Sequence, residues 1–173
     1  MSQDEKELYE LITQGPRAQA RQHFALTDGH GRLTGPFGDF LLSPKVGTAL
    51  QALGSTLRYQ IDLSDRAREL AILTVAARLR SNFEQESHEA IAQALGFNED
   101  ELIAIRREDM TLFDPYESQV GQTVTALLNG DLDEAHWKAA KESLGARTVF
   151  ELIALVGYYS TLALQLRVFR ADS

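Results

Sequence analysis

The stretch that decides the fold is residues 66–106, RARELAILTVAARLRSNFEQESHEAIAQALGFNEDELIAIR. Its first part belongs to a helix predicted over about 64–80, whose apolar residues cover more than one face, so that helix should be deeply buried. A second helix is predicted over about 82–95, ended by the glycine that follows. The pattern Asn98-x-x-Glu101 is a capping box that opens a third, short helix. Three consecutive helices, the first of them buried, are therefore expected.

The flanking sequence is helical in pattern as well. Glycines and a proline gather in residues 24–42, which predicts a loop with a short turn or helix at its end. Further helices are predicted over 3–13, from Ser43-Pro44 onward, from Pro115 to about Asn129-Gly130, over 132–144 with a stop at Gly145, and over 147–169. No alternation typical of strands is present. We expect one all-α domain over 1–173, with an N-terminal extension, 1–42, and a core, 43–173.

Composition excludes several classes of protein. The chain has 173 residues, a formal net charge of -8 and no cysteine. Without cysteine there is no disulfide, thiolate or zinc-thiolate chemistry. Lysine and arginine form no block, which argues against a nucleic-acid partner. The N-terminus lacks the pattern of a signal peptide, and the last helix is interrupted by charges, so a membrane span is not expected. The prediction is a cytoplasmic protein.

The segment SNFEQESHEA, residues 81–90, raises two alternatives. Ser81-x-x-Glu84 matches a capping box, which would satisfy backbone donors at the start of a helix. Glu84 and His88 are four residues apart, so on a helix they share a face and could exchange a proton. The residues alone leave both alternatives open.

From about residue 30 to 170 the chain resembles the carboxymuconolactone decarboxylase-like proteins, a family that includes the AhpD-type alkylhydroperoxidases. The resemblance is carried by the stretch 66–106 and by the final helix, FELIALVGYYSTLALQLRVF. It implies an oligomeric AhpD-like helical bundle. In the peroxidase branch the pattern is Glu, Cys-x-x-Cys, then His, which falls here on Glu69, Ser81, Glu84 and His88. Because both cysteines are replaced, thiol peroxidase chemistry is not expected.

The decarboxylase branch has a glutamate and a histidine at the spacing of Glu84 and His88. It tends to carry a further histidine where this chain has Phe83, and to lack the glutamate found here at position 69. The resemblance implies a cofactor-independent decarboxylation of a small lactone or cyclic acid from aromatic catabolism. His88 would donate the proton, Glu84 would orient it or share the proton, and Glu69 would tune the pKa of its neighbours. Such a cluster would repel an anionic substrate unless it were partly protonated or offset by a cation, and Arg66, Arg78 and Arg80 are nearby in sequence.

Other functions stay open at this point. The chain could be another acid–base enzyme, such as a lactone hydrolase or isomerase, or an inactive protein that binds a small ligand. The expected partners are a small-molecule substrate and copies of the chain itself, in a homotrimer or homohexamer. No metal and no organic cofactor is predicted, since the sequence His88-Glu89-Ala90-Ile91-Ala92 lacks the second histidine of a zinc motif.

Substrate binding is assigned to Ser81, His30 and Phe37, each with a structural alternative. Ser81 could be a helix cap, and the loop that holds His30 and Phe37 could be a solvated connector. Glu69 could be an exposed acid in the first turn of its helix. The tyrosine pair at 158–159 is expected to pack in the core.

Overall fold

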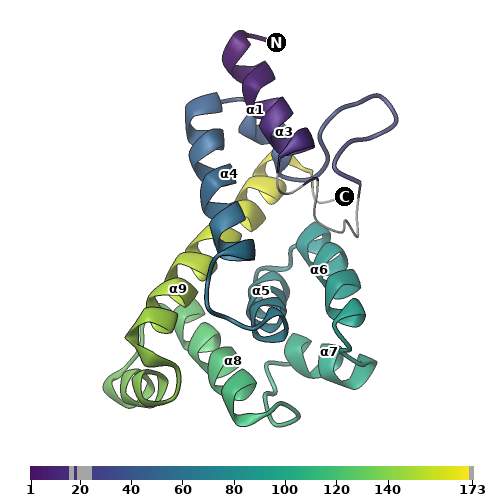
Figure 1. Cartoon of the computed structure of the whole chain (residues 1–173). Coiled ribbons are helices and arrows are strands. Elements are labelled where there is room, and N and C mark those ends of the chain that lie inside the picture. Colours follow the sequence, from purple (N-terminus) through teal and green to yellow (C-terminus); the bar gives the residue numbers. More distant parts are fainter. Residues whose placement is uncertain (16–17, 19–24, 172–173) are drawn as a thin grey trace.

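The computed structural model describes residues 1–15, 18 and 25–171, and all regular elements within these residues are helices (Figure 1). This confirms the predicted all-α fold. The bounds are α1 Gln3–Gln14, α3 Phe37–Phe40, α4 Pro44–Tyr59, α5 Asp65–Leu79, α6 Asn82–Ala94, α7 Glu99–Arg106, α8 Pro115–Leu128 and α9 Glu134–Phe169. Phe24, the first residue of the predicted Gly-rich loop, lies outside the described residues.

Helix α5 is the centre of the molecule. It packs against α6, α7, α8 and α9, which surround it in Figure 1. Residues 67–76 are all buried, which confirms the deep burial predicted from an apolar pattern on more than one face. Each large aliphatic side chain buried in this way contributes about 1.5–3 kcal/mol. Glu69 lies inside this run and is fully buried, so the alternative of an exposed first-turn acid is wrong.

Most helices begin at the residues that the sequence predicts. The Ser64 hydroxyl accepts a hydrogen bond from the Ala67 amide at 3.2 Å, which caps α5. Asn98 and Glu101 form the predicted capping box of α7, with both reciprocal bonds present. Helix α4 begins at Pro44 as predicted, but the Ser43 side chain makes no capping bond.

A tight connection joins α5 to α6. Arg80 adopts a left-handed conformation, with φ 55° and ψ 46°, and ends α5. The amide of Ser81 then donates to the Ala76 carbonyl at 3.0 Å, and α6 begins at the next residue. Because only two residues separate the helices, α6 folds back along α5, and side chains on their facing sides meet.

The C-terminal helix α9 consists of two segments. Gly145 has φ 81° and ψ 155°, a non-helical conformation that kinks the helix where the sequence predicts a stop. The first segment starts at Glu134, with Asp133 as its cap, slightly later than predicted. Helix α9 is long and apolar enough to span a membrane by composition, but half of its apolar window is buried inside the protein, as in a core helix.

The N-terminal extension covers one end of the bundle. Helices α1 and α3 both pack on α4 (Figure 1). The Gln165 amide of α9 donates to the Pro36 carbonyl at 2.6 Å and to Asp39 at 3.1 Å, which fixes the end of the Gly-rich loop. At Gly35 the backbone passes so close to α6 that a Cβ atom would overlap the Phe83 ring. The loop therefore reaches the start of the helix that carries Glu84 and His88.

Candidate functional site

Glu69, Glu84 and His88 form one buried cluster between α5 and α6. The Nδ1 atom of His88 lies 2.6 Å from Oε2 of Glu69, and its Nε2 atom lies 3.3 Å from Oε2 of Glu84. Glu69 is 0% exposed, Glu84 4% and His88 5%. The structure thus brings together all three residues predicted to be catalytic, with the imidazole between the two carboxylates.

Two arginines complete the charge of this cluster. Nη1 of Arg58, in the last turn of α4, lies 3.1 Å from Oε1 of Glu69 and 3.3 Å from Nδ1 of His88. Nε of Arg68 lies 3.6 Å from the same oxygen of Glu69, while its Nη2 pairs with Asp65 at 2.8 Å. Glu69 therefore faces three cationic groups when His88 is protonated.

Aromatic side chains from α9 also contact the cluster. The Tyr159 ring meets the His88 ring edge-on, with 5.4 Å between centroids, and Tyr158 packs edge-on against Tyr159 at 5.2 Å. Tyr159 also lies close enough to Arg58 to contribute to the raised pKa of that guanidinium. Both tyrosines are buried, as predicted, but Tyr159 also contacts the candidate proton donor, which the sequence pattern does not indicate.

The electrostatic environment favours an ion pair between His88 and Glu69. Burial alone would lower the pKa of His88, but the adjacent Glu69 carboxylate, helped by Glu84, raises the pKa above its ordinary value. Burial alone would likewise raise the pKa of Glu69, but His88, Arg58 and Arg68 lower it. Burial raises the pKa of Tyr159, so its hydroxyl stays protonated near neutral pH.

The two nitrogens of His88 are not equivalent. The short contact with Glu69 fixes Nδ1–H and the ring orientation, as in an acid–base dyad. The Nε2 contact with Glu84 is longer, at 3.3 Å, and a substrate atom could replace it without breaking the Glu69 bond. The arrangement can therefore deliver a proton from Nε2, or accept one there.

Ser81 does not cap α6, although it occupies the N-cap position. Its hydroxyl forms no hydrogen bond with any residue that the structure describes, and the Glu84 carboxylate faces His88. Of the two alternatives for this segment, the capping box is therefore wrong, because Glu84 pairs with the imidazole instead. Ser81 is buried and, together with Arg80 and Arg106, lines a cavity of about 380 Å³ where α5, α6 and the end of α7 meet.

The other predicted substrate-binding residues lie in the Gly-rich loop and α3. His30 is exposed, and its amide donates to Asp28 at 2.8 Å. Phe37 is buried and packs edge-on against Phe40, with 5.8 Å between ring centroids. The role of His30 and Phe37 in substrate binding stays a prediction, as does that of Ser81.

Arg58 is a cation of the cluster that sequence reasoning missed. Arg66 and Arg78 are closer in sequence to the cluster but have other partners, since Arg66 pairs with Glu101 and Glu117, and Arg78 pairs with Glu108. A weak signal was present in α4, where the spacing Gly47, Gln51, Gly54, Arg58 follows one helix face. The first three are buried, which places the guanidinium on the side that meets the core.

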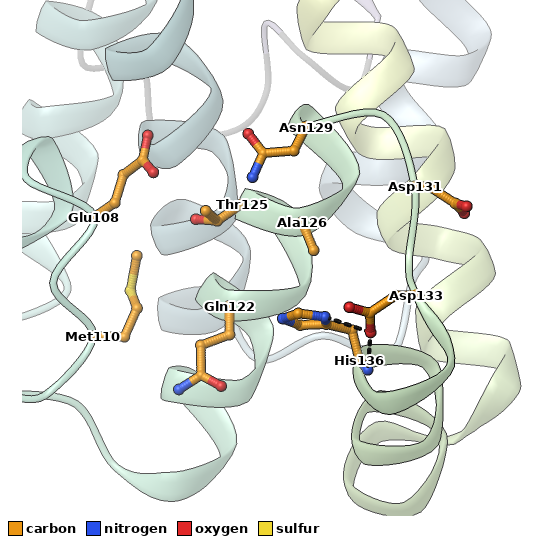
Figure 2. A pocket seen from close by; sticks show the side chains of 9 residues that line it. All are labelled: Glu108, Met110, Gln122, Thr125, Ala126, Asn129, Asp131, Asp133 and His136. Atoms are coloured by element: carbon orange, nitrogen blue, oxygen red, sulfur yellow. Dashed lines mark hydrogen bonds and ion pairs between the residues drawn. The ribbon is translucent and has the colours of Figure 1, made fainter.

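A second pocket lies apart from the cluster, between α8 and the start of α9. Figure 2 shows the side chains that line it, which include Glu108, Met110, Thr125 and Asn129. The volume of this pocket is about 460 Å³. His136 projects over it and is held by Asp133, with Nδ1 2.7 Å from Oδ1. Within the described residues, no group of three or more His, Asp or Glu side chains is arranged to hold a metal ion.

Comparison with known proteins supports the fold. Residues 44–117 match the sequence model of the carboxymuconolactone decarboxylase family, which confirms the predicted resemblance over that segment. A search of curated protein sequences gives no match. The crystal structure of the debrominase Bmp8, as a cysteine-to-alanine variant in complex with 2,3,4-tribromopyrrole, superposes with a TM-score of 0.71 at 11% identity, covering 95% of this chain and 82% of Bmp8. The AhpD-like helical fold is thereby confirmed.

Proposed function

From the match of residues 44–117 to the carboxymuconolactone decarboxylase family, we propose that the chain is a cofactor-independent acid–base decarboxylase. Its substrate would be a small unsaturated lactone or cyclic acid from aromatic catabolism. The observation that carries the proposal is the burial of His88 between Glu69 and Glu84, at 2.6 and 3.3 Å. A histidine held in this way is suited to proton transfer in a site from which water is largely excluded.

The proposed reaction needs one proton and no oxidant. The bond between the substrate carboxylate and the ring breaks, CO2 leaves, and the electron pair moves into the conjugated lactone carbonyl to give a dienolate. His88 then donates the Nε2 proton to carbon, while Glu69 keeps Nδ1–H in place and stabilises the imidazolium before transfer. Solvent returns a proton to His88 after each turnover.

The charge balance of the cluster supports an anionic substrate. Two carboxylates, Glu69 and Glu84, would repel such a substrate by themselves. Arg58 lies 3.1 Å from Glu69, and the Glu69 carboxylate raises the pKa of His88, which favours the cationic imidazolium; both effects offset the negative charge of the cluster. The repulsion expected from the sequence is thus compensated by a residue from a different helix.

A binding protein without activity is the second candidate. The observation that favours it is that every charged group of the cluster is already paired with another one. None of these side chains is more than 13% exposed. Buried ion pairs of this kind also occur as purely structural features.

An ultraviolet assay of 4-carboxymuconolactone consumption tests the proposal. Wild type should turn over the lactone, whereas His88→Ala and Glu84→Gln should lose it, by about 10²–10⁴-fold for a proton-transfer residue. Glu86→Gln is the matched control, because Glu86 is an exposed glutamate on the same helix and should be dispensable.

Each outcome decides between the candidates. Full activity in His88→Ala would remove His88 from the mechanism. Inactive but folded wild type would reject this substrate, and a panel of other lactones would then separate a lactone hydrolase or isomerase from a binding protein.

A further inference from the structure

We propose that Arg58 is a positioning residue that shares Glu69 with His88 and thereby keeps His88 able to release its proton. The proposal deepens, and for its catalytic meaning rests on, the acid–base function proposed above. It assigns a task to a residue on α4, outside the α5–α6 pair that carries the proton-transfer groups.

The geometry of Glu69 is the first observation behind this assignment. Its two oxygens are divided between different partners: Oε2 faces His88 at 2.6 Å, and Oε1 faces Arg58 at 3.1 Å. Because Nη1 of Arg58 is also 3.3 Å from Nδ1 of His88, the three groups form a closed triangle. Nη1 of Arg58 and Nδ1 of His88 both face the Glu69 carboxylate, so His88 shares the negative charge of Glu69 with Arg58.

The surroundings of His88 show why such sharing matters. The groups that face the ring are Glu69 from α5, Glu84 from α6, Arg58 from α4 and Tyr159 from α9, with Arg68 and Tyr158 behind them. Two carboxylates at hydrogen-bond distance stabilise the imidazolium strongly in a buried site. If the pKa of the His88 imidazolium is raised too far, the imidazolium becomes a poor proton donor. Proton transfer is most efficient when the pKa of the donor lies near the working pH.

Arg58 is the group that opposes this stabilisation. It is the cation nearest to His88, and its positive charge acts to lower the pKa of the imidazole. The side chain is only 13% exposed, so solvent screens this interaction little. Arg58 also sits in the last turn of α4, where a cation stabilises the helix end, so a purely structural role must be separated by experiment.

The test is an NMR titration of the His88 ring proton in the full chain. The four histidines are resolved by comparison with His88→Ala. In Arg58→Gln the pKa of His88 should rise by roughly one unit or more, the size of shift that a neighbouring charge causes in a partly buried site. Arg58→Lys, which keeps the charge, should shift the pKa less. Arg66→Gln is the control, because Arg66 pairs with Glu101 and Glu117 and should leave His88 unchanged.

The titration requires no substrate, so its result is independent of whether 4-carboxymuconolactone is turned over. If the lactone is a substrate, the alkaline limb of the kcat profile of Arg58→Gln should also move to higher pH, with a lower plateau. An unchanged or lowered pKa in folded Arg58→Gln would overturn the proposal. Arg58→Met, which keeps much of the side-chain volume, is the second variant if Arg58→Gln does not fold, and the same shift is required of it.

Discussion

At the scale of single residues, Glu69 is the side chain on which the cluster depends. It is fully buried, and His88, Arg58 and Arg68 all direct positive charge at it. A buried carboxylate is tolerated only when its charge is compensated, and here the compensation comes from three helices or their ends. Removing it would take away the carboxylate that pairs with Arg58 and the nearer of the two carboxylates that face His88.

Glu69→Gln should therefore destabilise the protein by about 3–5 kcal/mol, as expected when one partner of a buried ion pair is lost. The pKa of Glu69 is lowered on folding, so its contribution is present above its ordinary pKa of 4.5 and is lost as the pH falls through the folded value. The pKa of His88 is raised, so its contribution is complete below 6.5 and is lost as the pH rises through the folded value. Urea unfolding measures the free energy of unfolding that Glu69→Gln loses relative to wild type, at one protein concentration. This loss should be largest at pH values between 4.5 and 6.5. A pH-independent difference would contradict the ion-pair assignment.

Ser81 and Ser64 provide a matched pair of cap positions. The Ser64 hydroxyl accepts a bond from the Ala67 amide, so Ser64→Ala should cost about 0.5–2 kcal/mol. The Ser81 hydroxyl has no bond within the described residues, so Ser81→Ala should cost less than about 0.5 kcal/mol or stabilise slightly, because an unpaired buried hydroxyl is removed. Chemical denaturation of both variants measures the contrast. Equal losses would mean that Ser81 does act as a cap.

The residues close in sequence were the ones that could be predicted. Glu84 and His88 share a helix face by spacing alone, and Glu69 was found through the family resemblance. Arg58 and Tyr159 could not be found in this way, since both reach His88 only through tertiary packing: α9 packs against α5, and α4 packs against α9. The capping box at Ser81 failed for a related reason: Glu84 has a buried charged partner, which a local pattern cannot reveal.

At the scale of elements, Gly145 divides the last helix. Its φ of 81° and ψ of 155° lie in a region open essentially to glycine alone. The stop was predictable because glycine is the usual residue at helix ends, and most helix starts followed from cap residues for the same local reason. What the pattern could not supply was how the two segments of α9 lie relative to each other.

Gly145→Ala should destabilise the protein by about 1–3 kcal/mol, because any side chain at this φ and ψ is strained. Thermal or urea unfolding followed by circular dichroism measures the loss. Ser143→Ala, at an exposed position two residues earlier, should stay within about 0.5 kcal/mol of wild type. A neutral Gly145→Ala would mean that the chain can straighten at this point without cost.

At the scale of the whole molecule, α9 presents an apolar surface that nothing in the described part of one chain covers. Phe150, Ile153, Leu164 and Val168 are exposed, and their spacing follows one face of the helix. Apolar patches of this kind mark interaction sites more often than free surface. The predicted homotrimer or homohexamer would bury this face.

We expect the wild-type protein to be an oligomer, and we expect this oligomer to dissociate when charged residues replace the apolar ones on the exposed face of α9. The double variant Phe150→Glu and Ile153→Glu should shift the mass measured by light scattering toward the monomer. Leu112→Glu is the control, because Leu112 is also exposed but lies in the connection between α7 and α8. A monomeric wild type would rule out self-assembly, and an unchanged mass in the double variant would place the interface elsewhere.

The contacts around His88 differ in sequence separation, and therefore in how early they can form during folding. Glu69 and His88 are 19 residues apart and belong to neighbouring helices, whereas Tyr159 arrives with the final helix. Contacts local in sequence close at lower entropic cost, so the α5–α6 hairpin can associate while α9 is still being synthesised. The charged side chains of this hairpin then stay hydrated, so their desolvation costs little free energy until α9 displaces the water. We therefore expect a nascent chain to bring Glu69 and His88 together before that pair has the dry surroundings on which its chemistry depends.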